Sequence, residues 1–133
     1  MTEKEATKEE VEKELNKNAD GISQEQVDET IKNESKIEMI LRHVEKLSVY
    51  WEEAKWVFSM IKDYAKGDYK NVPWRSIAIL VAALAYVLAP FDLVPDFIPI
   101  IGWSDDCLAL GGALAFAKMD LEEYKVWKKA QNS

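Results

Sequence analysis

Four aspartates stand close together in one short stretch of the sequence, YVLAPFDLVPDFIPIIGWSDD, which spans residues 86–106. They are Asp92, Asp96, Asp105 and Asp106, and the stretch contains no lysine, arginine or histidine. Carboxylates that lie near one another raise each other's pKa unless a positive charge or hydrogen-bond donors compensate them. The first question about this chain is therefore which groups compensate these four side chains.

Three kinds of partner could do so. Backbone N–H groups at turns and at a helix start are the first, because the short Asp side chain accepts hydrogen bonds there. Basic side chains of an earlier helix are the second, with Arg42, Lys46 and Lys55 as candidates. A divalent cation is the third, since oxygen-only ligands suit Mg²⁺, Mn²⁺ or Ca²⁺. We prefer the structural role, and keep as the alternative a metal-binding protein or hydrolase that uses Asp92, Asp96, Asp105 and Asp106.

Prolines and a glycine determine how this bend is built. Pro90, Pro95 and Pro99 cannot continue a helix, and each biases the residue before it away from helical angles. Gly102 permits a sharp reversal, after which Ser104 or Asp105 can cap the next helix. We therefore expect two apolar helices in an antiparallel hairpin, with all four aspartates at the closed end.

The residues PFDLVPDFIPIIGWSDD closely resemble the signature of the YkvA-like family, whose domain has no established function. The matching positions are Pro90, Asp92, Pro95, Asp96, Pro99, Gly102, Asp105 and Asp106. Weaker similarity extends the resemblance over about residues 55–128. The resemblance implies a small, largely bacterial helical protein that associates with membranes, and it implies no reaction.

A regular apolar pattern precedes the bend. From Ile37, steps of three and four residues connect Ile40, Val44, Leu47, Trp51, Ala54, Phe58, Ile61 and Ala65. This spacing predicts one long amphipathic helix that ends near Lys66, where Gly67 can adopt the left-handed conformation. The Ile37–Ala65 seam is compatible with a homo-oligomer, but the bulky Trp51 and Phe58 favour a helical bundle.

Residues 76–91 then contain no charge over 16 positions, so we expect a helix over about 74–90 that is apolar on every side. Such a helix is either the centre of a bundle or embedded in a membrane. At about 1.5 Å per residue it covers about 24 Å, less than the ~30 Å hydrocarbon core. A second apolar run, residues 107–117, is shorter. Both a water-soluble core and a membrane-associated hairpin remain open.

The two ends of the chain have a different character. Residues 1–36 hold 11 acidic and 6 basic side chains with scattered apolar positions, so we expect a disordered tail over residues 1–21. Ser23 with Gln26 forms a capping-box pattern and predicts a helix start. We expect a single helical domain over residues 22–133, with Asp120 as the N-cap of a short terminal helix.

Composition restricts the function. The net charge of −7 disfavours nucleic acid as a partner. One cysteine and no apolar leader among the first twenty residues predict an intracellular protein, cytoplasmic or membrane-associated and not secreted. We recognise no catalytic constellation and no cofactor motif. The sequence therefore predicts an all-α, non-catalytic helical module of unknown function that acts through protein or membrane contacts.

Overall fold

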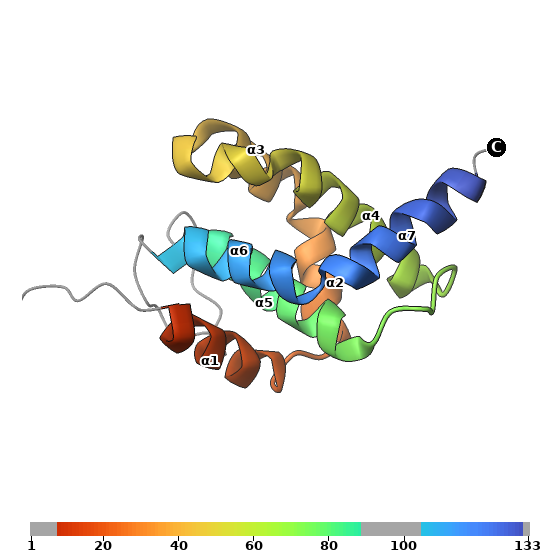
Figure 1. The fold of residues 1–133 in the computed structure, drawn as a ribbon, viewed down its shortest axis with the longest axis horizontal. Helices are drawn as coiled ribbons and strands as arrows, with labels where there is room; N and C mark the ends of the chain where they lie inside the picture. The colour runs from red at the N-terminus through yellow and green to blue at the C-terminus, as the bar shows by residue number, and fades with distance from the viewer. Residues whose placement is uncertain (1–7, 89–104, 132–133) are drawn as a thin grey trace, which may run out of the picture.

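The computed structural model describes residues 8–88 and 105–131. Over this part of the chain the fold is all-α, as predicted, and Figure 1 shows its helices in chain order. They are α1 (Lys8–Ala19), α2 (Gln24–Lys32), α3 (Glu34–His43), the 3-10 helix η1 (Glu45–Tyr50), α4 (Trp51–Lys66), α5 (Trp74–Leu88), α6 (Asp105–Phe116) and α7 (Lys118–Gln131).

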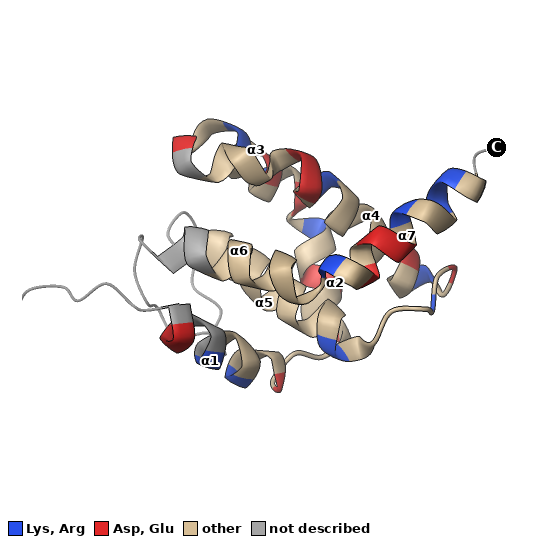
Figure 2. Ribbon diagram, in the orientation of Figure 1, with Lys and Arg blue, Asp and Glu red and all other residues tan. Residues whose placement is uncertain are grey.

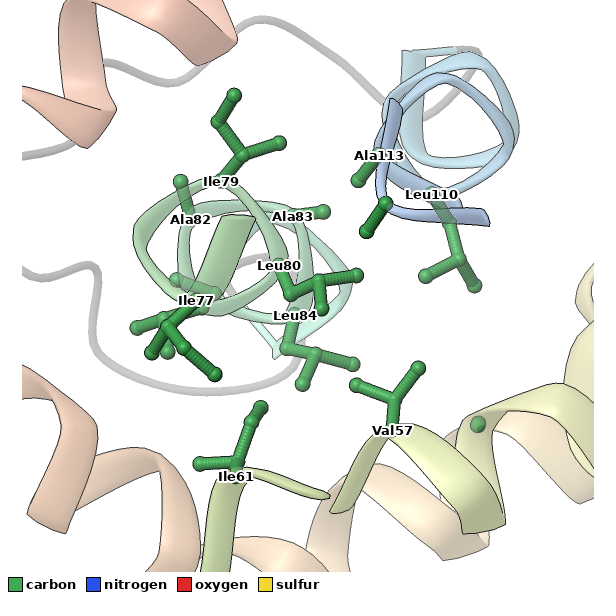
Figure 3. Close-up of a cluster of buried hydrophobic side chains, with 14 of the residues drawn as sticks. Val57, Ile61, Ile77, Ile79, Leu80, Ala82, Ala83, Leu84, Leu110 and Ala113 are labelled. Atoms are coloured by element: carbon green, nitrogen blue, oxygen red, sulfur yellow. The ribbon is translucent and has the colours of Figure 1, made fainter. Parts of the chain in front are cut away.

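Helix α5 forms the centre of the molecule. Every residue from Ser76 to Leu88 is buried, and α5 contacts α1, α2, α3 and α6. Figure 3 shows its side chains surrounded by those of neighbouring helices, including Val57 and Ile61 of α4. An apolar surface that faces other helices on all sides needs no polar face toward water. The prediction of a charge-free central helix is confirmed.

Helix α1 differs from the charged tail expected over residues 1–21. Leu15 and Ala19 are each 2% exposed, and α1 contacts both α5 and α6. Asn18 is also buried, and its side-chain nitrogen donates to the hydroxyl of Tyr86 on α5, at 2.6 Å. These few positions are enough to attach the helix, because α5 and α6 supply the apolar surface that α1 lacks.

The single long helix predicted from Ile37 to Lys66 is wrong. The chain leaves the helical conformation at Val44 (φ −88°, ψ 111°), continues as η1, and resumes as α4 at Trp51. The interruption lets α3 and α4 contact each other, and α3 also contacts α5. One straight helix could not bury its first half against its second half, so the break increases the apolar surface that this segment buries.

Most of the expected seam is buried inside this chain. Among its members, Ile37, Ile40, Leu47, Ala54, Phe58 and Ile61 are buried, and Val44, Trp51 and Ala65 pack partly against the same core. The seam residues therefore contribute to the core of this chain, and the homo-oligomer through the Ile37–Ala65 seam stays a prediction.

Three helix ends can be compared with the sequence. The capping box of Ser23 and Gln26 precedes α2, as predicted. Gly67 ends α4 in the left-handed conformation (φ 83°), also as predicted. Asp120, however, is not the N-cap of the last helix, because α7 begins at Lys118. Its carboxylate instead accepts a hydrogen bond from Ser76 Oγ at 2.6 Å, which connects the first turns of α5 and α7.

Candidate functional site

The bend that the sequence analysis singled out lies mostly outside the described residues. These include Pro90, Asp92, Pro95, Asp96, Pro99 and Gly102. Asp105 and Asp106 are the first two residues of α6, but their side chains are not among those that the structure describes. The structural role of these residues, and the metal site proposed for the four aspartates, stay predictions. Among the residues that the structure describes, no three His, Cys, Asp or Glu side chains gather closely enough to hold a metal ion.

The two helices that flank the bend are arranged as expected. Helices α5 and α6 pack against each other and run in opposite directions in Figure 1. The end of α5 at Leu88 and the start of α6 at Asp105 therefore lie at the same end of the pair. Of the basic candidates for the bend, Lys55 pairs with Glu52 at 3.0 Å, and Arg42 lies over the ring of Trp51.

A buried chain of hydrogen bonds, which the sequence analysis missed, connects α4 to α7. Tyr124 donates its hydroxyl proton to Asp63 Oδ2 at 2.5 Å, and its oxygen lies 2.5 Å from the Ser59 hydroxyl. Lys128 donates to the same Asp63 oxygen at 3.0 Å. Asp63 is 7% exposed and Tyr124 is fully buried. The only sequence signal is that Asp63 follows the buried Met60 by three residues, on the same helix face.

The ionisation of this cluster indicates a structural role. Burial raises the pKa of Asp63, but the hydrogen bonds from Tyr124 and Lys128 outweigh it and lower the pKa below its ordinary value. Burial and the hydrogen bond to Asp63 raise the pKa of Tyr124. The carboxylate therefore stays charged and the phenol stays neutral at pH 7. Neither group is poised to exchange a proton near that pH, as a catalytic acid or base would be. We therefore infer that the role of the cluster is to attach α7 to α4.

Aromatic rings extend the same interface. The ring of Tyr124 packs edge-on against those of Trp56 and Tyr69, with centroids 6.3 and 5.0 Å apart, and Trp127 packs against Tyr69 at 4.9 Å. Lys125, which pairs with Glu53 at 2.9 Å, lies over Trp56. Trp56 and Met60, which fell outside the predicted seam, thus pack within this chain.

A hollow of about 590 Å³ adjoins this interface, with Tyr69 and Trp127 on one side and the side chains of Asp68, Lys70 and Glu123 around it. Tyr69 is 3% exposed, and within the described structure its hydroxyl has no hydrogen-bond partner. The charges around the hollow are of both signs, so its lining does not select the charge of a ligand.

The outer face of α6 has a different chemistry. Residues 107–117 contain no charge, and Ala109, Leu110, Ala113 and Ala117 face the core. On the other side Ala115 is exposed, Phe116 is 52% exposed, and Met119, one residue into α7, is 79% exposed. We refer to Gly112, Ala115, Phe116 and Met119 as the outer α6 surface. In Figure 2 the described ribbon of α6 is tan throughout, without a blue or red segment.

This surface borders a shallow groove between three helices. The groove has a volume of about 280 Å³ and is lined by Leu15 and Asn16 of α1, Ile79 of α5, and Gly112, Ala115 and Phe116 of α6. Arg75 of α5 reaches toward α1. Its guanidinium donates hydrogen bonds to the carboxylate of Asp20 and to Asn16 Oδ1. Gly112, Ala115 and Phe116 thus belong both to the outer α6 surface and to the groove.

An all-α bundle built around a pair of apolar helices, α5 and α6, defines the class of this protein. The family described as "Protein of unknown function (DUF1232)" matches residues 76–115, which include most of both helices. The chain is 34% identical over 71 residues to "Uncharacterized membrane protein YkvA" of Bacillus subtilis (strain 168); the match covers 53% of this chain and 67% of that relative. The chain belongs to this YkvA-like family, and its function is unknown.

Two further findings accompany this assignment. No solved structure shows significant similarity to the chain. Among the helices of the described residues, none is both long enough and apolar enough to cross a membrane. The relative's description as a membrane protein is consistent with a membrane-associated protein.

Proposed function

We propose that this protein is a non-catalytic helical module that acts through contacts of its apolar surface with a protein or a membrane. The observation that carries the proposal is the exposed outer α6 surface. Soluble domains seldom leave a contiguous apolar patch in water, and patches that persist usually mark an interaction surface. Here Phe116 and Met119 are 52% and 79% exposed, beside a helix that has no charge from residue 107 to residue 117.

The comparison of α5 with α6 supports this. Residues 76–88 of α5 and 107–116 of α6 carry no charge, and the structure buries every residue from Ser76 to Leu88 between the neighbouring helices. Helix α6 packs against α1, α5, α7 and η1, and yet its apolar residues Ala115 and Phe116 remain exposed. If apolar composition served the core alone, the exposed positions of α6 would be polar, as they are on other surface helices.

Membrane association is part of the proposal. It is supported by the description of the Bacillus subtilis relative as a membrane protein. Because α5 is covered by other helices, it offers no face to lipid in this fold. A contact with lipid would therefore use exposed apolar side chains such as Phe116 and Met119.

The test combines cell fractionation with cross-linking of the untagged protein. We expect the native chain in the membrane fraction or in cross-linked complexes, and we expect Ala115→Glu to reduce both. Val126→Glu is the matched control, because Val126 is 71% exposed on α7 and lies outside the outer α6 surface. The proposal fails if Ala115→Glu, folded by circular dichroism, leaves the distribution and the cross-links unchanged.

A further inference from the structure

We propose that helix α1 is an autoinhibitory cover of the α5–α6 pair, which detaches reversibly in a minority of molecules and so regulates the contact made by the outer α6 surface. This inference rests on the proposed function, because it names a regulation of the same surface. Helix α1 contacts both α5 and α6, and it borders the outer α6 surface along the groove of about 280 Å³. It lies outside residues 76–115, the part of the chain that the family match covers.

Hydrogen bonds attach α1 to both ends of α5. Near the end of α5, Asn18 donates to the Tyr86 hydroxyl at 2.6 Å. In its first turn, Arg75 donates to the carboxylate of Asp20, and to O and Oδ1 of Asn16 at 3.1 and 2.8 Å. When a helix detaches, such groups exchange these bonds for bonds to water, so the net contribution of each bond to the attachment is small.

The apolar contribution of α1 is also small. Among its side chains that the structure describes, the buried apolar ones are Leu15 and Ala19. The groove that Leu15 and Asn16 of α1 share with Gly112 and Phe116 of α6 lies between the two helices. Closely packed helices leave few spaces larger than a water molecule between them. The contact of α1 with α6 is therefore incomplete at this point.

The side of α5 that faces α1 can tolerate exposure to water. Arg75, Ile79 and Tyr86 are spaced by four and seven residues, which places them on one side of the helix. Figure 3 shows Ile79 on the opposite side of α5 from Val57 and Ile61 of α4. The side toward α1 thus has an apolar centre between two polar groups that water can hydrate. Detachment of α1 leaves the contact of α5 with α4 unchanged.

Detachment enlarges the apolar surface. Ile79 is 2% exposed beneath α1 and lines the same groove as Ala115 and Phe116, so its uncovered side is continuous with the outer α6 surface. A partner that contacts both binds the open state more tightly and shifts the population toward it. The apparent affinity is reduced by the fraction of molecules that is open. The attachment of α1 therefore controls the strength of the contact.

Hydrogen exchange of the full chain, measured by mass spectrometry, tests the opening. After correction for intrinsic rates, we expect the amides of α1 to exchange at least about tenfold faster than those of residues 77–86, because local opening precedes global unfolding. Arg75→Gln and Asn18→Ala each remove bonds to α1. Each should raise the exchange in α1 by a further factor of about five or more and leave that of residues 77–86 unchanged.

Lys17→Ala is the matched control, because Lys17 is exposed on the same helix, and it should leave the exchange in α1 within about twofold. The side chain of Arg75 is 41% exposed, so Arg75→Gln should leave the core folded even if Asn18→Ala does not. Circular dichroism checks the folding of each variant.

Fractionation and cross-linking of the same variants test the regulation. We expect Arg75→Gln and Asn18→Ala to increase the share of the chain in the membrane fraction or in cross-linked complexes, and Lys17→Ala to leave it unchanged. Because Arg75→Gln removes a positive charge, an increase in this variant cannot come from attraction to an anionic surface.

Two results of the exchange experiment overturn the cover: amides of α1 that are as protected as residues 77–86, or variants that raise the exchange of both segments alike, which would make α1 an integral part of the core. Unchanged or reduced association of variants whose α1 opens more overturns the regulation. These results leave the proposed function intact. Absence of the native chain and of the opened variants from both the membrane fraction and cross-linked complexes would overturn the proposed function, and this inference with it.

Discussion

At the scale of single residues, Asp63 is a buried carboxylate whose hydrogen-bond partners the structure shows in full. Asp63 is held by Tyr124 and Lys128, both on α7 and more than sixty positions away in sequence. The distance in sequence explains why no local pattern identified the cluster. The aspartates of the bend were conspicuous because no basic residue accompanies them, and Asp63 was inconspicuous because it has neighbours of both charges.

The lowered pKa of Asp63 predicts an acid-dependent loss of stability. A carboxyl whose pKa is lower in the folded than in the unfolded chain stabilises the fold above its unfolded value, here about 3.8, and loses that contribution as the pH falls through the folded value. Chemical denaturation of the native chain and of Asp63→Asn between pH 7 and pH 2.5 measures this. The difference in free energy of unfolding should be largest at pH 7 and shrink below about pH 4.

Asp68→Asn is the control, because Asp68 is exposed and its replacement should change the free energy of unfolding by less than about 0.5 kcal/mol at pH 7. Tyr124→Phe should cost about 1.5–3 kcal/mol at pH 7, the range for a hydrogen bond to a charged group. A pH-independent difference between Asp63→Asn and the native chain would contradict the lowered pKa.

At the scale of elements, the sequence predicted those helices whose signals are local. The start of α2 follows from Ser23 and Gln26, the end of α4 from Gly67, and the burial of α5 from its lack of charge. The break at Val44 could not be predicted, because the spacing of apolar residues continues through it. The chain interrupts the helix there to bring α3 against α4, a gain that depends on tertiary contacts only.

Helix α1 was missed for a related reason, and its contribution can be measured. Asn18→Ala removes a buried hydrogen bond to Tyr86 and should lower the free energy of unfolding by about 1–3 kcal/mol. Lys17→Ala, at an exposed position of the same helix, should change it by less than about 0.5 kcal/mol. Urea denaturation distinguishes the two. Equal stability of both variants would show that α1 behaves as the tail that composition suggested.

The contact of η1 with α6 depends on Gly111. A Cβ at this position would approach the Tyr50 hydroxyl to 2.9 Å, while alanine is favoured over glycine in a helix interior by about 0.8–1 kcal/mol. Gly111→Ala in the native chain should therefore raise the free energy of unfolding by less than that amount, or lower it. In a Tyr50→Phe background the nearest atom is removed, and the same change should stabilise by about 0.5–1 kcal/mol. A double-mutant cycle with no coupling between the two positions would rule out this contact.

At the scale of the whole molecule, α5 joins the other elements into one structure. It contacts α1, α2, α3 and α6, while α7 is attached mainly to α4 through the Asp63 cluster and the aromatic rings. Helix α5 is therefore the centre of the core, and α7 lies at its periphery. Ala115, Phe116 and Met119 of the outer α6 surface remain exposed, while α1 lies beside this surface and shares the groove with it.

This organisation predicts how the molecule unfolds. A chain whose described helices share one core should unfold in a single cooperative transition, with helix content and tryptophan environment lost together. Trp56 and Trp127 report on the α4–α7 interface, and far-ultraviolet circular dichroism reports on all helices. We expect the two thermal curves to coincide. In Tyr124→Phe, which weakens the attachment of α7, the fluorescence transition should move to lower temperature before the loss of helix content. If the two curves are already separate in the native chain, α7 is not part of the cooperative unit, since local opening of a peripheral element precedes global unfolding.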